Sequence, residues 1–491
     1  MLPFRSLINF GERKNMPIFQ FIANHLITLI RQGKILPGSS LPATREMAIL
    51  IEVHRNTITK AYNELRAQGW VDAIHRKGFV VRSDLPISKP RSYPLEIKYY
   101  SDPVIPEKAS IYIPKGFNFI PQKLYPGSIF IDDGFPDIRL APIKELLKGY
   151  QNIIDRKSVK ELSFANSLGD SRLAYSTADM LNKTRGLNTR SENILITRGA
   201  QMAIYLAAAI LLKEGDEIVV GEPGYFMANS VFRQFGVKIN FLPIDEDGID
   251  VDRIEDLLRK KNIKLLYLIP HHHHPTTVTL SFSRRIQLLK LIQRYRIWVI
   301  EDDYDYDFQY QEGHILPLAS NDKSGQVIYI GSYSKILTPS IRIGFMVAST
   351  QLIERAITLQ KLIDFGGDVA MESSLASLID RGDLSRHVNR SLKIYKHRFE
   401  NTSKLINSEL RHIISFRKPL GGMALWLKFE DSYPLSKILL KLAKSGVVIS
   451  GTTYYKDAYK HYNHIRFGFA SLTDNELQNV IEVFKKVISK S

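Results

Sequence analysis

Five short apolar runs between residues 193 and 331 alternate with segments of helical periodicity, and this alternation constrains the fold more than any other feature. Short runs that are apolar on both faces are typical of strands in a parallel sheet, and strand–helix alternation is typical of α/β proteins. We therefore expect an α/β fold with a mostly parallel sheet in the larger part of the chain. The expected strands are residues 193–197, 217–221, 265–270, 298–303 and 327–331, with helices such as 201–212 and 283–295 between them.

The last of these runs leads into a loop that carries an amine, hydroxyls and a guanidinium, in the sequence GSYSKILTPSIRIG. Ligands of such sheets bind outside the carboxyl ends of the strands. Lys335 is expected to form a Schiff base, the internal aldimine, with pyridoxal 5'-phosphate. Ser332 and Arg342 are expected at its phosphate, the arginine through its planar fork, and Ser334 is a further expected cofactor-site residue. The alternative is a surface lysine near a serine-rich turn.

Two further strand ends carry residues that suit the same cofactor. Gly199, Ala200 and Gln201 open an alanine-rich helix, where backbone amides and the helix dipole favour a phosphate. A single glycine at such a position is, however, also common in ordinary turns. Tyr225 follows the next strand and is predicted to stack on an aromatic ring, the alternative being an aromatic residue at the rim.

A fourth strand ends in the acidic segment EDDY. A carboxylate buried there needs a partner, because an isolated buried charge is costly. We expect Asp302 to pair with a protonated pyridine nitrogen and so make the ring an electron sink. Tyr304 is expected to donate a hydrogen bond to the phenolic oxygen of the cofactor.

The first eighty residues have a different pattern. Helical spacing predicts helices over residues 17–31, from about residue 44 with Thr44 as the N-cap, and over 56–67. Two short strands, residues 70–74 and 78–81, then flank a basic turn. Three small helices followed by a hairpin indicate a winged helix-turn-helix. The alternative is a three-helix accessory domain with a solvated basic face.

The composition limits which partners and which cellular location the protein can have. The net charge of +17 is compatible with a nucleic-acid partner but is also produced by scattered surface lysines. Residues 1–84 carry 12 Lys and Arg against 6 Asp and Glu, a net +6 and about twice their proportional share. No apolar run approaches a membrane span, so no membrane partner is expected. The absence of cysteine excludes disulfides and thiolate metal sites and fits a cytoplasmic location.

These observations predict three parts. Residues 1–82 form the winged helix-turn-helix, residues 83–125 a linker, and residues 126–491 the larger α/β domain. The linker is expected because residues 83–125 are rich in proline, lysine and tyrosine and lack sustained periodicity, and an unstructured loop of that length is improbable inside one domain.

The N-terminal sequence contains LPATREMA, then VHRNTITKAYNELRAQGW, then RKGFVV, and it closely resembles the GntR family of bacterial transcription regulators. This resemblance implies binding to operator DNA. The positions that match the DNA-contacting residues of the family are Arg45, Arg55, Asn56 and Thr57, and Gly78 matches the glycine of the wing.

Further along, TRGAQMA, EPGY, HHHHPTT, EDDY and SYSKxLxPxxRxG occur in the order found in fold type I pyridoxal-phosphate aminotransferases. With the N-terminal module they resemble the MocR subgroup of GntR regulators over nearly the whole chain. The resemblance implies a homodimer, domain-swapped as in that subgroup, with an aminotransferase-like sensor of pyridoxal phosphate or of an amine or amino-acid effector. The alternative is an active aminotransferase with an accessory winged helix.

Some segments depart from the family pattern. Of the loop that usually resembles SHQFPTG, only His272, Pro275 and Thr276 match, and His272 is the expected cofactor-site residue among four adjacent histidines. No metal site is expected there, because consecutive side chains of an extended segment point to opposite faces. Arg466 matches the arginine that holds the substrate carboxylate and is the candidate ligand of an effector carboxylate, the alternative being a salt-bridged strand arginine. Met227 stands where some members have a second effector-binding arginine.

Overall fold

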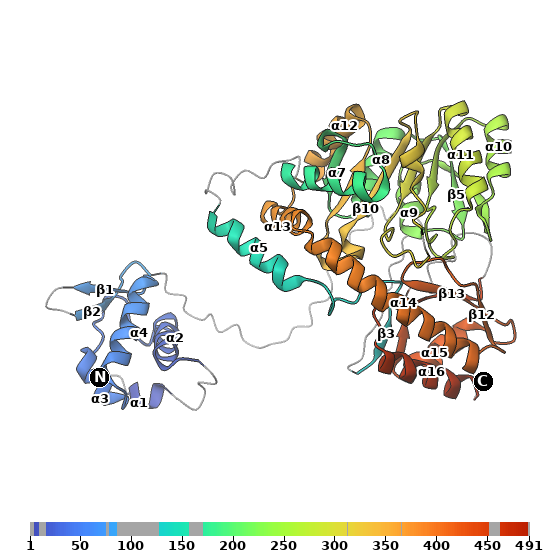
Figure 1. The fold of residues 1–491 in the computed structure, drawn as a ribbon. Coiled ribbons are helices and arrows are strands. Elements are labelled where there is room, and N and C mark those ends of the chain that lie inside the picture. The colour runs from blue at the N-terminus through green and yellow to red at the C-terminus, as the bar shows by residue number, and fades with distance from the viewer. Residues whose placement is uncertain are drawn as a thin grey trace, which may run out of the picture. The chain divides into compact units, whose positions relative to one another are not determined.

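A computed structural model describes residues 4–8, 16–74, 78–85, 127–156, 170–311, 313–364, 366–450 and 462–489. The chain divides into two compact units, Met1–Ile111 and Tyr112–Ser491 (Figure 1). The division falls within the segment predicted as a linker, residues 83–125, of which only residues 83–85 are described. Among the described residues, no helix combines the length and apolar character that crossing a bilayer requires.

The N-terminal unit has the helices and hairpin of a winged helix-turn-helix. After the short α1 (Phe4–Leu7) come α2 (Ile18–Arg31), α3 (Thr44–Leu50) and α4 (Arg55–Ala67), then the antiparallel strands β1 (Val71–Ile74) and β2 (Gly78–Val81). Apolar residues at helical spacing on α2 and α4, such as Leu26 and Ile58, meet in one core. Thr44 is the first helical residue rather than the N-cap, which is Ala43. The basic turn of the wing, residues 75–77, lies outside the described residues.

An eight-stranded sheet forms the centre of the large unit, in the order β4-β11-β10-β9-β8-β5-β6-β7. The five central strands β10, β9, β8, β5 and β6 pair in parallel, while β11 and β7 run antiparallel to their neighbours. The predicted mostly parallel sheet is confirmed. The strands are β4 (Ile194–Thr197), β5 (Glu217–Glu222), β6 (Lys238–Asp245), β7 (Gly248–Ile249), β8 (Ile263–Leu268), β9 (Trp298–Asp302), β10 (Val327–Ser332) and β11 (Gly344–Val347).

Helices cover both faces of this sheet, as the apolar character of its strands requires (Figure 1). On one face, strand residues such as Ile300 and Ile330 pack with α8 (Ala200–Leu211), α9 (Phe226–Gln234) and α12 (Thr350–Ile363). On the other face, Val219 and Val299 pack with α10 (Val251–Lys260) and α11 (Phe282–Tyr295), and α7 (Ser171–Arg185) and α13 (Val369–Asp380) cover the strands near β4. Helix α5 (Ile143–Arg156) packs against α13.

The C-terminal part forms a second core beside the sheet. The long helix α14 (Asp383–Glu409) leads to the sheet β12-β13-β15, made of β12 (Ile414–Phe416), β13 (Ala424–Phe429) and β15 (His464–Gly468), and to the helices α15 (Leu435–Lys444) and α16 (Asp474–Ile488). Strand β14 (Val447–Ile449) pairs in parallel with β3 (Ile129–Ile131). This pairing ties the start of the large unit to its C-terminal part (Figure 1).

Candidate functional site

A cavity of about 200 Å³ lies where the carboxyl ends of β9 and β10 meet the N-terminus of α8. Its lining includes nine of the residues that the sequence predicted for the cofactor. They are Ala200, Gln201, Tyr225, Asp302, Tyr304, Ser332, Ser334, Lys335 and Arg342. These nine residues come from four separate segments of the chain and converge on one site.

Lys335 ends a short 3-10 helix that directly follows β10, so the strand delivers its amine to the cavity. The Lys335 Nζ donates to the Gly134 carbonyl at 2.9 Å and lies 3.7 Å from the centre of the Phe135 ring. Burial lowers the pKa of Lys335 to about 8, although the nearby Asp133 carboxylate opposes this shift. A buried lysine with a lowered pKa is a competent nucleophile toward a carbonyl compound.

One end of the cavity is built to receive an anion. Gly199 caps α8 with φ 83° and ψ 171°, and a Cβ placed there would lie 2.8 Å from Arg342 Nη2. The guanidinium of Arg342 therefore packs on the glycine at the helix N-terminus, and its Nη2 donates to the Arg198 carbonyl at 2.8 Å. The Ser332 hydroxyl accepts from the Ser334 amide at 3.2 Å. Helix amides, a guanidinium and two hydroxyls form an electropositive cradle for a phosphate.

At the other end of the cavity lies the carboxylate of Asp302, which is buried. Its Oδ2 accepts from the Tyr267 hydroxyl at 2.7 Å, whereas its Oδ1 has no hydrogen-bond partner among the described residues. Burial raises the pKa of Asp302 to about 7, and the neighbouring Asp303 adds to the shift. An unsatisfied buried carboxylate oxygen is costly, so this end suits a cationic N–H donor such as a protonated pyridine.

Tyr304 and Tyr225 flank the cavity in different ways. The Tyr304 hydroxyl donates to the His272 carbonyl at 2.7 Å and accepts from Arg466 Nη2 at 3.0 Å. Tyr225 contacts the His274 ring edge to face, with the ring centres 5.1 Å apart. Both aromatic rings therefore have fixed orientations at the wall of the cavity.

The four histidines take four separate partners. His271 contacts Asp303 at 3.2 Å, His272 contacts Asp305 at 2.9 Å, His273 contacts Thr276 at 2.9 Å, and His274 contacts Asp133 at 2.7 Å. His272, the residue predicted for the cofactor site, does not line the cavity, whereas His274 does. Within the described ranges, no three His, Cys, Asp or Glu side chains are grouped as a metal site requires.

Arg466 is buried and engaged by the protein. It lies on β15 with 1% of its surface exposed, and its nitrogens donate to the Asp133 carbonyl, the Pro275 carbonyl and the Tyr304 hydroxyl at 3.2, 3.0 and 3.0 Å. Arg466 is not among the residues that line the cavity. Asp133 and Tyr304, which both contact Arg466, do line the cavity.

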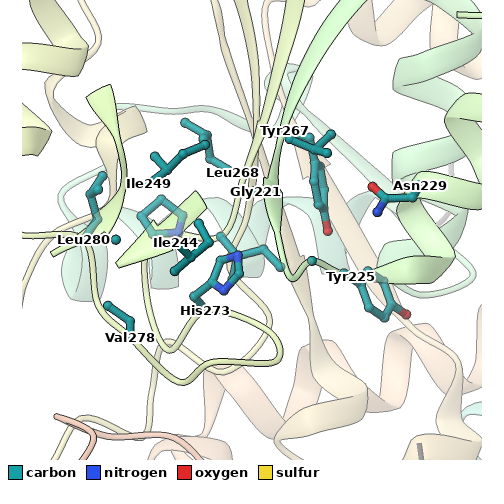
Figure 2. Close-up of a pocket in the computed structure, with 15 residues that line it drawn as sticks. Gly221, Tyr225, Asn229, Ile244, Ile249, Tyr267, Leu268, His273, Val278 and Leu280 are labelled. Atoms are coloured by element: carbon teal, nitrogen blue, oxygen red, sulfur yellow. The ribbon is translucent and has the colours of Figure 1, made fainter. Parts of the chain in front are cut away.

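A second, much smaller cavity of about 20 Å³ shares Tyr225 with the first (Figure 2). Tyr267 and Asn229 face it from one side and His273 from the other (Figure 2). Both amide atoms of Asn229 are buried and have no hydrogen-bond partner in the described part of the chain. A space of this size admits about one water molecule, which the amide would bind. This cavity is too small for an organic ligand.

The N-terminal unit presents a polar surface at the start of α4. Arg45, Arg55 and Asn56 are exposed and Thr57 is half-buried, while Ile58 and Leu65 on the same helix are buried. His54 caps the helix, its ring accepting from the Asn56 amide at 3.2 Å. Gly78 begins the second strand of the wing with φ 82°, a conformation that favours glycine. The predicted DNA-contacting residues thus lie on the outer face of the helix-turn-helix.

Family comparison agrees with both units. The description "Aminotransferase class I and II" matches residues 142–484, more than half of the chain. The chain belongs to this aminotransferase family. Residues 19–81 of the same chain match the description "Bacterial regulatory proteins, gntR family". The predicted combination of a GntR DNA-binding module with a fold type I aminotransferase domain is confirmed.

Relatives with both domains are named as regulators. The uncharacterized HTH-type transcriptional regulator YisV of Bacillus subtilis is 26% identical over 95% of each chain. The probable rhizopine catabolism regulatory protein MocR of Rhizobium meliloti is 27% identical over 84% of this chain and 82% of its own length. A crystal structure of Pyrococcus horikoshii kynurenine aminotransferase is 26% identical, with a TM-score of 0.68 over 74% of this chain and 91% of that chain. The two regulators, which match this chain over both of its units, support a regulator rather than an active aminotransferase.

Five residues that line the cavity were not predicted from the sequence, namely Asp133, Phe135, Ile269, His274 and Pro339. Asp133 and Phe135 come from the segment after β3, and His274 from the histidine run. No spacing signal connects Asp133 with Lys335, because 201 residues separate them and only the folded sheet brings them together. The acidic pair Asp132 and Asp133 directly before a glycine was the available local signal.

Proposed function

We propose that this protein is a pyridoxal-phosphate-dependent transcription regulator that binds operator DNA through residues 1–82 and senses a small molecule through its aminotransferase-like domain. The observation that carries the proposal is the presence of two sites in one chain. A winged helix exposes polar residues at its DNA-facing turn, and a separate cavity joins an anion cradle to a buried amine and a buried carboxylate. Access to chromosomal DNA would require a cytoplasmic location.

The cavity residues fit pyridoxal phosphate. Arg342, Ser332, Ser334 and the amides of Ala200 and Gln201 would hold its phosphate at the N-terminus of α8. The Ser334 hydroxyl, which is buried and has no partner among the described residues, would gain one. Bound pyridoxal phosphate supplies an electrophilic carbonyl carbon and an electron-withdrawing ring.

The remaining site residues act on the ring and on its carbonyl group. Asp302 would accept from the ring nitrogen through its unpaired Oδ1 and thereby keep the nitrogen protonated. Lys335 would supply the amine that bonds to the carbonyl carbon, and Tyr225 would pack on the ring. Tyr304 would reach the phenolic oxygen of the ring while it keeps its contact with Arg466.

DNA would be bound by α4 in the major groove, as in other helix-turn-helix proteins. Arg55 and Asn56, at the exposed start of this helix, would reach base edges, and Arg45 and Thr57 would contact phosphates or bases. Gly78 would let the wing approach the sugar–phosphate backbone. Selection of genomic DNA fragments by the purified protein, followed by sequencing, tests this part and identifies the operator.

The active form would be a homodimer. Two winged helices related by two-fold symmetry can read two half-sites about one helical turn apart or multiples of it. A segment of about 40 residues spans at most about 130 Å when fully extended, so each DNA-binding unit could pack on the large unit of the partner in a domain-swapped arrangement. Sedimentation of the full chain at several concentrations tests the dimer.

Sensing would couple the two sites. The effector is pyridoxal phosphate itself or an amine or amino acid that reacts with it at Lys335. If the effector changes operator affinity by some factor, operator DNA must change effector affinity by the same factor. Titrating the effector with and without operator tests this, and equal affinities in the two titrations would exclude the coupling.

An active aminotransferase is the second candidate, because Lys335, Asp302 and the anion cradle are all present. A catalyst with an amino donor and a 2-oxo acid would release product continuously, whereas a sensor would convert at most one equivalent of bound cofactor. Incubating the loaded protein with both substrates and measuring product per subunit separates the two functions.

A further inference from the structure

The wall of the cavity nearest Lys335 presents a carboxylate. Asp133 lines the cavity with 26% of its side chain exposed, whereas the side chain of Arg466 behind it is 1% exposed. The Asp133 Oδ1 lies 3.6 Å from Arg466 Nε, and its Oδ2 lies 2.7 Å from His274 Nε2. A molecule entering this cavity therefore meets Asp133 before it can reach Arg466.

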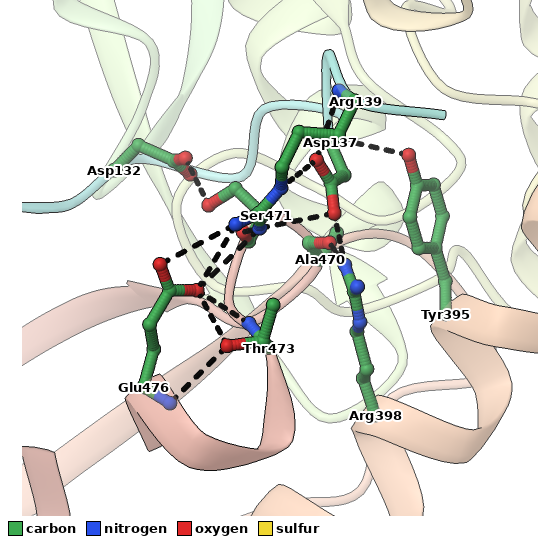
Figure 3. A network of polar contacts seen from close by, with 9 residues as sticks. All are labelled: Asp132, Asp137, Arg139, Tyr395, Arg398, Ala470, Ser471, Thr473 and Glu476. Carbon is green, nitrogen blue, oxygen red and sulfur yellow. Dashed lines mark hydrogen bonds and ion pairs between the residues drawn. The ribbon is translucent and has the colours of Figure 1, made fainter. Parts of the chain in front are cut away.

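The segment that carries Asp133 is fixed at both ends by the C-terminal part of the chain (Figure 3). On one side, Asp132 accepts from the amides of Gly134 and Phe135 at 2.9 and 2.8 Å and from the Ser471 hydroxyl. These bonds fix the backbone of the turn from which the Asp133 side chain projects.

On the other side of Asp133, Asp137 is held by three groups (Figure 3). Its carboxylate accepts from Arg139 Nε at 2.7 Å and from Arg398 Nη1 at 2.8 Å, and its amide donates to the Tyr395 hydroxyl at 2.9 Å. Arg139 also reaches Glu476 at the start of α16. Two anchors, five residues apart, thus hold the position of Asp133 between them.

At this wall the charge of Asp133 is already opposed by that of Arg466. Arg466 contributes one positive charge and Asp133 one negative charge. Burial lowers the pKa of His274, so its ring is neutral at pH 7 and adds no positive charge. With the phosphate matched by Arg342 and the ring nitrogen by Asp302, a carboxylate brought in by the effector would be an unpaired buried charge beside Asp133.

We propose that Asp133 is a specificity-determining residue that selects a primary amine without a carboxylate next to its amino group, and disfavours α-amino acids. This inference rests on the proposed function, because it assumes that pyridoxal phosphate is bound at Lys335. It also assigns Arg466 a new role: the guanidinium orients Asp133 and Tyr304 and does not itself bind an effector carboxylate.

The test compares amino acids with the amines that remain when their carboxylate is removed. The pairs are L-alanine with ethylamine, L-leucine with 3-methylbutylamine, and L-lysine with pentane-1,5-diamine. Each compound is titrated into the full-length, pyridoxal-phosphate-loaded protein, and the change in visible absorbance and the shift of the thermal midpoint give its apparent Kd. We expect at least one amine to bind tenfold or more tightly than its amino acid.

Asp133→Asn keeps the size of the side chain and removes its charge. We expect this variant to lower the preference for the amine at least tenfold, chiefly through tighter binding of the amino acid. Glu246→Gln, at a carboxylate whose side chain is 86% exposed, is the matched control and should keep the wild-type preference.

The outcomes separate this inference from the proposed function. If the wild-type protein binds no pyridoxal phosphate, the proposed function fails and the inference fails with it. If the cofactor binds but every amino acid binds as tightly as its amine, or none of the amines binds, only the inference is overturned. An amine preference that Asp133→Asn leaves unchanged would assign the selectivity to another residue.

Discussion

Replacing Gly199 by alanine adds a single Cβ atom beside Arg342 and so tests whether this part of the cavity binds the phosphate. Gly199 has φ 83° and ψ 171°, a region that is almost restricted to glycine, and occupying it with alanine costs about 1–3 kcal/mol. The added Cβ would also lie 2.8 Å from Arg342 Nη2 and 3.1 Å from its Cζ, so the guanidinium must move away. We expect the variant to lose both folding stability and affinity for pyridoxal phosphate.

The loss of affinity can be estimated from the displaced arginine. A hydrogen bond to a charged group contributes about 1.5–3 kcal/mol, which corresponds to roughly a ten- to hundredfold weaker Kd. Titration of pyridoxal phosphate, followed by visible absorbance, measures this change, and urea unfolding measures the stability. Both experiments use the full chain.

Gly215 offers a matched control. It also has a positive φ, 86°, but a Cβ there meets no heavy atom within 4 Å. Gly215→Ala should therefore lose unfolding free energy through its backbone conformation alone and bind the cofactor as the wild-type protein does. Equal cofactor affinity in Gly199→Ala and Gly215→Ala would refute the assignment of Arg342 to the phosphate.

Three further predictions concern the amine and the DNA-binding surface. Lys335→Ala should abolish the visible absorbance of the bound cofactor while circular dichroism stays unchanged; a retained absorbance would assign the imine to another lysine. Only the neutral form of the Lys335 amine can attack the cofactor, and burial lowers the pKa of this amine to about 8. The rate of covalent cofactor capture should therefore rise about tenfold per pH unit below pH 8 and level off above it. A rate that still rises steeply at pH 9.5 would contradict this pKa. Arg55→Ala should weaken operator binding by about 1–3 kcal/mol without changing cofactor affinity, whereas normal operator binding by both Arg45→Ala and Arg55→Ala would exclude the assigned surface.

The sequence predicted the strands that are long and apolar on both faces. Strands β5, β8, β9 and β10 were expected to within three residues at each end, because central strands must be apolar to pack with helices on both sides. The antiparallel β11 (Gly344–Val347) was missed. It has four residues, and its place between β4 and β10 depends on pairing with strands that are distant in the sequence.

Close backbone approaches were also invisible in the sequence. At Gly344, the first residue of β11, an added Cβ would lie 2.7 Å from the Gly199 carbonyl carbon. The glycine therefore permits the turn that carries Gly199 to lie against β11. A glycine in a motif indicates such an approach only after the two segments have been placed in space.

By itself, the sequence determined the combination of a GntR module with an α/β aminotransferase domain, and it predicted Lys335, Asp302 and Arg342, which the structure brings to one cavity. Local patterns determine these features, because strand ends and helix starts are set by residues close together in the chain. Only the tertiary structure decided which histidine reaches the cavity and what stands before Arg466. His274 and Asp133 are 141 residues apart in the chain and their side chains meet at 2.7 Å, because β3 pairs with β14 and the C-terminal part then fixes the segment that follows. Such a contact depends on the closure of the whole domain, and no local pattern in the sequence encodes it.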